Sequence, residues 1–433
     1  ATTEIYTLSL HDALPICHVN AYFPLFIPES YLQKEAEHVE GFAPEVAWVT
    51  HGGAEPLHER LAVRPTSETI ICAMYARWIQ SWRDLPVLIN QWANVVRWEK
   101  ATRPFLRTTE FLWQEGHTAH RTAEEAEEET RRMLEVYRDF VETDLAIPVV
   151  VGRKTEGEKF AGAVHTYTIE ALMSDGRALQ AATSHNLGQH FAKVFDITFL
   201  DQDDQLKHVW QTSWGMTTRI IGALIMVHGD DRGLVLPPKV APIQVVIVPI
   251  APQKERERVL AEARALRQEL EEHVRTHLDD RDEYTPGWKF NEWEMRGVPL
   301  RLEIGPRDIE RGQVILARRD NGSKIPVSRN GLVDVVKGFL QDVQKNLWQK
   351  ARQFMDENTR TVDSVDELKA IMEDKRGFVL GGWCGEGSCE DAVKEKTGAT
   401  IRCIPLAEPD WKGDRCICCG GHAKYTVYFA RAY

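Results

Sequence analysis

Arg97-Trp98-Glu99 precedes, after a short gap, the run Pro104-Phe105-Leu106-Arg107-Thr108-Thr109-Glu110-Phe111-Leu112-Trp113-Gln114-Glu115-Gly116-His117. The pattern predicts two strands joined by a loop. An arginine stays charged and offers a planar fork, so Arg97 and Arg107 suit a phosphate or a carboxylate better than lysines would. Trp113, Glu115 and His117 alternate, so on a strand they project to one face. Chance would hardly supply the whole string, which therefore indicates a binding site for an anionic ligand.

Length and composition limit the class of protein. The chain has 433 residues, more than the about 250–300 at which single cores stop growing, so we expect two or three domains. Its 43% hydrophobic and 27% charged residues are typical of a globular protein, and no apolar run reaches the roughly 18 residues of a membrane span. The net charge of −12 argues against unspecific nucleic-acid coating, yet it allows a local basic face for RNA.

The chain divides at residues 236–239, where two prolines interrupt helix and strand alike. Before this boundary short strands alternate with helices. The clearest helix covers residues 122–145, because Thr122 and Glu125 form a capping box before apolar residues at helical spacing. The acidic run at 124–129 is most simply a solvated first turn of this helix.

Beyond the boundary we expect a small three-layer α/β domain. Strands are predicted at residues 243–248 and 299–304, a helix at 259–274, and a hairpin whose turn is Asn321-Gly322. Residues 301–330 carry seven basic side chains against four acidic ones, a local excess that suits RNA. A helical connection at 335–358 then leads to a cysteine-bearing module.

Close cysteine pairs in this last module predict a zinc site. Cys384 and Cys389 form one pair, and Cys416 pairs with either Cys418 or Cys419, of which we favour Cys419. Four thiolates make a closed tetrahedral shell, so the zinc should be structural. Cys403 lies in a predicted strand and should be buried without a ligand role. Pairs of this kind favour a metal site in a reduced cytosolic compartment over disulfides.

The string at 97–117 resembles motif 2 of the class II aminoacyl-tRNA synthetases, and other segments narrow the resemblance to the prolyl-tRNA synthetase family. They are the Thr66-Ser67-Glu68 loop at 63–69, the segment at 180–185, and a motif 3-like segment at 213–222. Taken alone, Thr66 and Glu68 would be a helix cap and a first-turn acid. The resemblance covers about residues 17–433 and matches the branch of the family that lacks the editing insertion.

The resemblance assigns roles to individual residues. It implies that proline is bound by Phe42, Thr66, Glu68, Arg97, Trp113, His117, Phe160 and His185. It implies that ATP is bound by Arg97, Glu99, Arg107, Thr108, Gln180, Thr183, Thr217 and Arg219, with Arg97 and Arg219 catalytic. Arg97 would bridge the α-phosphate and the prolyl carboxylate. Arg307, Arg318 and Arg319 would contact tRNA.

The resemblance also implies an organisation. Residues 17–238 would be an α+β catalytic domain, the class II antiparallel sheet with flanking helices. Residues 239–345 would be an α/β anticodon-binding domain, and residues 346–433 a small α/β zinc-binding domain. Residues 1–16 match nothing, and the motif 1 helix of the family is missing there. We therefore hypothesise that residues 1–16 are unrelated sequence and that the chain is truncated, which should weaken a homodimer.

The implied activity is ligation of L-proline to tRNA(Pro) through prolyl-adenylate, with ATP as substrate and Mg²⁺ and structural Zn²⁺ as cofactors. The partners would be proline, tRNA(Pro) and a second copy of the chain, in the cytoplasm and without a membrane. Two alternatives remain. Another class II synthetase, such as a threonyl or glycyl enzyme, would share motifs 2 and 3. A non-catalytic tRNA-binding remnant would retain the domains without the activity.

Overall fold

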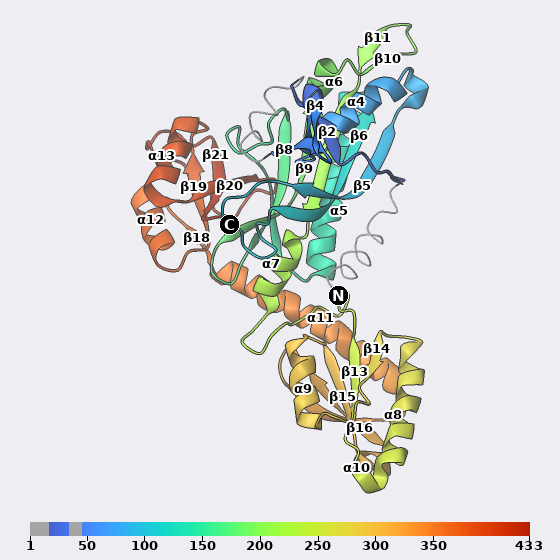
Figure 1. Cartoon of the computed structure of the whole chain (residues 1–433). Helices are drawn as coiled ribbons and strands as arrows, with labels where there is room; N and C mark the ends of the chain where they lie inside the picture. The colour runs from blue at the N-terminus through green and yellow to red at the C-terminus, as the bar shows by residue number, and fades with distance from the viewer. Residues whose placement is uncertain (1–16, 34–45) are drawn as a thin grey trace. The chain divides into compact units, whose positions relative to one another are not determined.

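The computed structural model describes residues 17–33 and 46–433 (Figure 1). These residues form two compact units: residues 140–148 with 224–356, and the remaining described residues. The hypothesis about residues 1–16 and the predicted role of Phe42 both fall outside the described residues.

One large mixed sheet is the frame of the larger unit. Its strands lie in the order β1 (Val19–Asn20), β5 (Val87–Val96), β6 (Glu110–His120), β12 (Trp210–Thr217), β9 (Ala178–Gly188), β8 (His165–Leu172), β7 (Val149–Arg153), β20 (Thr400–Pro405), β21 (Tyr425–Ala430), β19 (Phe378–Trp383) and β18 (Thr359–Thr361). Neighbours from β5 to β19 pair antiparallel. The two outer pairs are parallel. The predicted class II antiparallel sheet is therefore present.

The two strands predicted around the motif 2 loop are β5 and β6, which pair antiparallel from Val87 opposite Ala119 to Val96 opposite Glu110. Gly116 allows the neighbouring strand to pack closely, because a Cβ at this position would lie 2.0 Å from the indole of Trp214.

Helices cover this sheet. They are α4 (Glu68–Trp78), α5 (Ala123–Asp139), α6 (His190–Val194) and α7 (Arg219–His228), with the short α2 (Glu29–Leu32) and η2 (Trp82–Asp84). The predicted capping box is confirmed, since the Glu125 amide donates to Thr122 Oγ1 (3.2 Å) and the Thr122 amide to the Glu125 carboxylate (3.3 Å). The predicted helix continues as a π-helical turn, η3 (Phe140–Asp144).

The expectation of a solvated acidic turn is wrong for Glu129. Its side chain is buried on the inner face of α5, where it accepts a hydrogen bond from Arg132 (2.9 Å).

Two small sheets complete this part of the larger unit. One has the order β2 (Phe26–Pro28), β4 (Glu55–Val63) and β3 (Ala47–Gly52), and the other pairs β10 (Thr198–Leu200) with β11 (Leu206–His208).

The cysteine-bearing module continues the large sheet. Strand β20 pairs with β7 at two positions, Ile404 opposite Arg153 and Pro405 opposite Gly152. Helices α12 (Val365–Glu373) and α13 (Gly387–Thr397) pack against β18–β21 (Figure 1). Gly152 permits the pairing, because a Cβ there would lie 2.5 Å from that of Cys403. The module is thus joined to the rest of the large sheet through the pairing of β20 with β7.

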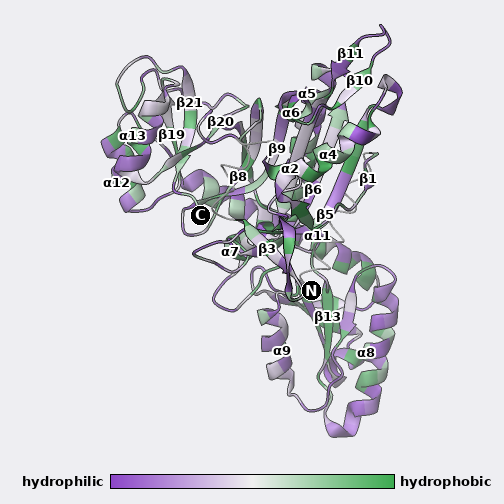
Figure 2. Cartoon of the chain, turned by 45° about the horizontal axis from the view of Figure 1, so that its top comes forward, coloured by the Kyte–Doolittle hydropathy of each residue, from purple (hydrophilic) through white to green (hydrophobic). Residues whose placement is uncertain are grey.

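The smaller unit is the predicted α/β domain. Its sheet has the order β14 (Thr276–Leu278), β13 (Val245–Pro249), β15 (Leu300–Ile304), β16 (Gln313–Arg318) and β17 (Lys324–Ser328), with β13 parallel to β14 and β15. Its helices are α8 (Arg256–Glu271), α9 (Pro286–Met295), α10 (Pro306–Glu310) and α11 (Leu332–Glu357), with the turn η4 (Gln253–Glu255). Figure 2 shows the apolar strand β13, which is buried throughout, beside the amphipathic α8. The predicted hairpin turn is confirmed, with Gly322 at φ +70°.

Candidate active site and metal centre

A cavity of about 300 Å³ opens in the larger unit, over strands β6, β9 and β12. Its wall contains every described residue to which the sequence assigned proline or ATP binding: Thr66, Glu68, Arg97, Glu99, Arg107, Thr108, Trp113, His117, Phe160, Gln180, Thr183, His185, Thr217 and Arg219. These positions span more than 150 residues of sequence, and the antiparallel sheet brings them to one face. Their individual roles stay predictions.

Buried acidic side chains form one end of the cavity. Glu68 opens α4 and accepts a hydrogen bond from the Thr66 hydroxyl. Beside it, Ser67 donates to the Glu115 carboxylate, and the same carboxylate accepts from the Gln91 amide at 2.6 Å. Buried carboxylates are costly unless they are bonded. This network therefore fixes two carboxylates next to a cavity, where they can accept hydrogen bonds from a cationic ligand.

His117 extends this network. Its Nε2 lies 2.9 Å from Glu115 Oε2, and the ring is buried. Burial alone would lower the pKa of His117, but the hydrogen bond to Glu115 and the charges of Glu115 and Glu68 outweigh it and raise the pKa. A protonated His117 therefore offsets the charge of Glu115, and the charge of Glu68 remains to bind a cationic ligand.

Arginines also line the cavity. Arg97 follows β5, donates from Nε to the carbonyl of Pro65 (3.1 Å), and lies over the rings of Phe111 and Trp113 at 5.5 and 5.7 Å. Arg107 pairs with Glu99 at 2.6 Å. These contacts hold the motif 2 loop and leave the guanidinium groups at the cavity wall.

Arg219 begins α7 and donates from Nε to the carbonyl of Leu106 (3.0 Å). Burial, with the repulsion of Arg97 and Arg107, lowers the pKa of Arg219 from its ordinary value. Since the ordinary value is far above neutral, Arg219 stays charged. Several like charges beside one cavity create a field that attracts a polyanion.

Aromatic rings form a further part of the cavity wall. The Phe160 and His185 rings are 4.7 Å apart, and His185 is held by Thr166 (2.9 Å) and Thr183 (3.0 Å). In the same cavity, the Trp113 indole N–H and the Ser213 hydroxyl have no hydrogen-bond partner among residues 17–33 and 46–433. Buried polar groups are normally satisfied. Their state fits a cavity that receives a polar ligand.

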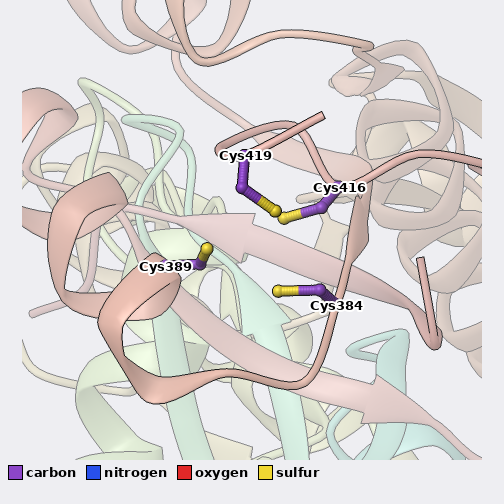
Figure 3. Close-up of side chains that lie close together, drawn as sticks. All are labelled: Cys384, Cys389, Cys416 and Cys419. Atoms are coloured by element: carbon purple, nitrogen blue, oxygen red, sulfur yellow. The ribbon is translucent and has the colours of Figure 1, made fainter. Parts of the chain in front are cut away.

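Four cysteine sulfurs converge in the C-terminal module (Figure 3). The Sγ atoms of Cys384, Cys389, Cys416 and Cys419 all lie within 4.8 Å of one another. Cys384 follows β19, Cys389 lies in α13, and the other two lie on the turn before β21. Four sulfurs in this arrangement are the donor set of a closed, structural zinc site. The sequence left Cys418 and Cys419 open, and the cluster contains Cys419.

Backbone N–H groups lower the pKa of one of these thiols. Burial raises the pKa of Cys416, but the N–H groups of Cys419 and Cys418 outweigh it and lower the pKa to about 7. Thiolate is the form that binds metal. The predicted burial of Cys403 is confirmed: it is fully buried, outside the cluster, and burial raises its pKa to about 12.

The three arginines assigned to tRNA differ in their surroundings. Arg307 is exposed at the start of α10. Arg318 is paired with Asp320 at 2.7 Å, and Arg319 is buried, where its guanidinium bonds the carboxylate of Asp230. Arg318 and Arg319 nevertheless line a cavity of about 120 Å³ with Arg301, Lys324 and Trp293, among others.

Family models match three parts of the chain: tRNA synthetase class II core domain (G, H, P, S and T) at residues 48–228, Anticodon binding domain at 244–339, and Prolyl-tRNA synthetase, C-terminal at 365–433. A protein of Natranaerobius thermophilus named Proline--tRNA ligase is 66% identical over 96% of this chain and 86% of its own length. The chain belongs to the proline–tRNA ligase family. Relatives from Symbiobacterium thermophilum (Proline--tRNA ligase, 62%) and Clostridioides difficile (Proline--tRNA ligase 2, 57%) match the same shares of both chains.

This membership confirms the predicted fold class and the prolyl branch of the class II synthetases. It favours the prolyl interpretation over the threonyl or glycyl alternative, since the relatives are named for proline. Class II synthetases use ATP, which agrees with the arginine-rich end of the cavity. No helix among the described residues is long and apolar enough to cross a membrane.

Sequence reasoning missed several residues of the proline–tRNA ligase site. Gln91 and Ser67 hold the Glu115 carboxylate, Ser213 lines the cavity, and Glu158 and Lys159 precede Phe160 on its wall. Ser67 and Ser213 lie within the motif-like segments at 63–69 and 213–222, and Glu158 and Lys159 directly precede Phe160. All four are therefore neighbours of predicted residues and could have been candidates. Gln91 gave no such signal, because an isolated glutamine on a strand has no diagnostic spacing.

Proposed function

We propose that the chain activates L-proline with ATP and transfers it to tRNA(Pro). The observation that carries the proposal is the cavity itself, whose wall combines the Glu68 carboxylate, the Phe160 ring, and the guanidinium groups of Arg97 and Arg219. Proline has a secondary ammonium, a flat apolar ring and a carboxylate. The cavity wall offers a partner for each of these groups: a carboxylate for the ammonium, aromatic rings for the pyrrolidine ring and arginines for the carboxylate. The ATP phosphates would also lie against the arginines.

In the first step, a carboxylate oxygen of proline forms a bond to the α-phosphorus of ATP, and the bond to the bridging oxygen of pyrophosphate breaks. The two N–H groups of the prolyl ammonium would donate hydrogen bonds to Glu68 and Thr66. Arg97 would hold the carboxylate against the α-phosphate, and Arg219 would stabilise the charge that develops on the phosphates. Catalysis of this kind is positioning and electrostatics. Mg²⁺ would enter as part of the MgATP substrate.

In the second step, the terminal 3′-hydroxyl of tRNA(Pro) attacks the carbonyl of the adenylate, and AMP leaves. The family places an anticodon-binding domain at residues 244–339, which suits tRNA as partner. Arg307, Arg318 and Arg319 remain proposed contacts, and the exposed Arg307 is the most accessible of the three. A homodimer and a cytoplasmic location are part of the same proposal.

The cysteine cluster would hold Zn²⁺ through Cys384, Cys389, Cys416 and Cys419. Four thiolates would leave no open coordination position, so the ion would fix the turns of the C-terminal module and take no part in the reaction.

Aminoacylation tests the proposal directly. Purified chain, MgATP, labelled proline and a tRNA(Pro) transcript should yield labelled Pro-tRNA(Pro), and threonine or glycine should not replace proline. Charging with threonine or glycine instead would identify another class II specificity. Binding of the transcript without charging any amino acid would establish the non-catalytic alternative.

Glu68→Gln should selectively weaken proline use. The amide keeps the size of the side chain but loses the charge that would bind the prolyl ammonium. Hydrogen bonds to charged groups contribute about 1.5–3 kcal/mol, so kcat/KM for proline should fall by roughly 10- to 150-fold. The KM for ATP should change little. Proline-dependent ATP–pyrophosphate exchange measures both, and the exposed Glu110→Gln on β6 is the matched control. An equal loss for both substrates would rule out a specific role in proline binding.

Cys419→Ser should lower the zinc content and the thermal stability of the C-terminal module, whereas Cys418→Ser should leave about one zinc per chain. The reason is that the sulfur of Cys419 belongs to the cluster. A chelator-released zinc assay on the purified variants measures the stoichiometry. Loss of zinc from Cys418→Ser alone would assign the fourth ligand to Cys418.

A further inference from the structure

The loop between β7 and β8 forms part of the cavity wall through Glu158, Lys159 and Phe160. It is built on Thr155, whose carbonyl accepts the backbone N–H groups of Glu158 (3.3 Å) and Lys159 (3.0 Å). A turn closed on one residue moves with that residue. The place of Thr155 therefore determines where this turn, here called the 155–160 turn, meets the cavity.

The end of the 155–160 turn is connected to the aromatic wall. The Phe160 amide donates to Thr166 Oγ1 at 3.0 Å, and the same hydroxyl lies 2.9 Å from Nδ1 of His185. The rings of Phe160 and His185 are 4.7 Å apart. A shift of the turn would consequently change the shape of the slot between Phe160 and His185.

Thr155 is held by a residue from a distant part of the chain. Its hydroxyl donates to Oε1 of Glu390 at 2.8 Å, across 235 positions of sequence, and both side chains are buried. Glu390 lies in α13, directly after the cluster residue Cys389. A Cβ on Gly157 would lie 3.5 Å from Oε2 of Glu390, so the backbone of the turn rests against the carboxylate.

A buried carboxylate destabilises the folded state unless it is hydrogen-bonded. The hydrogen bond from the Thr155 hydroxyl satisfies the buried Glu390 carboxylate. The second contact between α13 and the turn is weak, since Lys394 and Glu158 are 4.0 Å apart and the Lys394 side chain is 60% exposed. The bond between Thr155 and Glu390 is therefore the main polar link between α13 and the cavity wall.

We infer that Glu390 is a positioning residue for the amino-acid end of the cavity. It holds Thr155, and through Thr155 the turn that carries Phe160, in the position that proline binding needs. The C-terminal module thus contributes to amino-acid binding through a side chain that does not touch the substrate. The inference rests on the proposed function for the identity of the ligand, and its structural part can be measured without that function.

Kinetics test the functional part. Thr155→Val and Glu390→Ala each remove the bond, whose net contribution corresponds to about a three- to tenfold effect. Each variant should raise the KM for proline by that factor in ATP–pyrophosphate exchange and leave the KM for ATP within twofold. The double variant should be no worse than the weaker-binding single variant, because both changes remove one interaction. Thr155→Ser and Glu390→Gln keep a donor and an acceptor and should stay near wild type.

Hydrogen exchange tests the structural part, whether or not the chain activates proline. The amides of Glu158 and Lys159 should exchange about three- to tenfold faster in Thr155→Val and in Glu390→Ala. Glu395→Ala, an exposed change on the same helix, is the control and should leave exchange at the turn unchanged. Zinc content is measured for each variant, because Glu390 is next to Cys389.

The outcomes separate the inference from the proposed function. Faster exchange at the turn together with a proline-specific rise in KM supports the inference. Unchanged exchange at the turn, additive effects in the double variant, or equal changes for proline and ATP would overturn it. If wild type shows no proline-dependent activity but the turn still loosens in the variants, the proposed function fails and the positioning of the turn by Glu390 stands.

Discussion

Arg97→Lys will lower the rate of proline activation by at least about 100-fold, and Arg97→Ala by about 1,000-fold, the loss typical of a removed transition-state donor. The guanidinium of Arg97 is held by the carbonyl of Pro65 and by the faces of Phe111 and Trp113, and it lines the cavity. Lysine keeps the charge but has one donor group in place of a planar fork, so it cannot bridge a carboxylate and a phosphate at once.

Single-turnover formation of prolyl-adenylate measures this effect without tRNA. Arg138→Ala is the matched control, because Arg138 lies on the outer face of α5 in a half-exposed pair with Glu135. We expect its rate to stay within twofold of wild type. A rate for Arg97→Ala within threefold of wild type would contradict the role that we assign to this arginine, and a loss shared by both variants would indicate impaired folding.

Glu170→Gln will strongly destabilise the larger unit. Glu170 is fully buried on β8, where it is paired with Lys154 of the β7–β8 connection (2.7 Å) and Arg402 of β20 (2.9 Å). Removing one partner of a buried ion pair costs about 3–5 kcal/mol, because the other charges are left unpaired. The variant should therefore unfold at a lower temperature, as measured by calorimetry with zinc present.

The same pair predicts a dependence on pH. Burial raises the pKa of Glu170, but the charges of Lys154 and Arg402 outweigh it and lower the pKa below its ordinary value. A carboxylate with a depressed pKa stabilises the fold above its unfolded pKa, about 4.3, and loses this effect as the pH falls through its folded value. The difference in stability between wild type and Glu170→Gln should thus be constant near neutral pH and shrink below about pH 4.

An exposed ion pair in the C-terminal module is the control for this experiment. Glu408 and Lys412 lie 2.9 Å apart, with side chains that are 83% and 60% exposed, so Glu408→Gln should change the stability by less than about 1 kcal/mol. If Glu170→Gln were as mild as Glu408→Gln, the buried triad would not be what holds the C-terminal module on the catalytic sheet.

Local patterns carried most of the fold prediction. The capping box of Thr122 and Glu125 located the start of α5. Alternation along 110–120 predicted the strand that presents Trp113, Glu115 and His117 to the cavity. Each of these signals depends on a few neighbouring residues, which is why the sequence alone was sufficient.

Long-range pairing could not be predicted in this way. Nothing near Glu170 indicates that its partner Arg402 lies 232 positions away, and the same holds for Thr155 and Glu390. The burial of Glu129 was missed for a related reason, since an acid on a helix is solvated unless tertiary packing covers it. The pairing of β7 with β20 brings Glu170 to Arg402, and its register is a property of the fold as a whole.

Proline-dependent ATP–pyrophosphate exchange on the 433-residue chain tests the central claim most directly, because this reaction takes place in the cavity and needs no tRNA. We predict exchange with proline and none with threonine or glycine, and loss of that exchange in Arg97→Ala with retained folding. Absence of exchange with proline from a folded chain, or equal exchange in wild type and Arg97→Ala, would contradict the account.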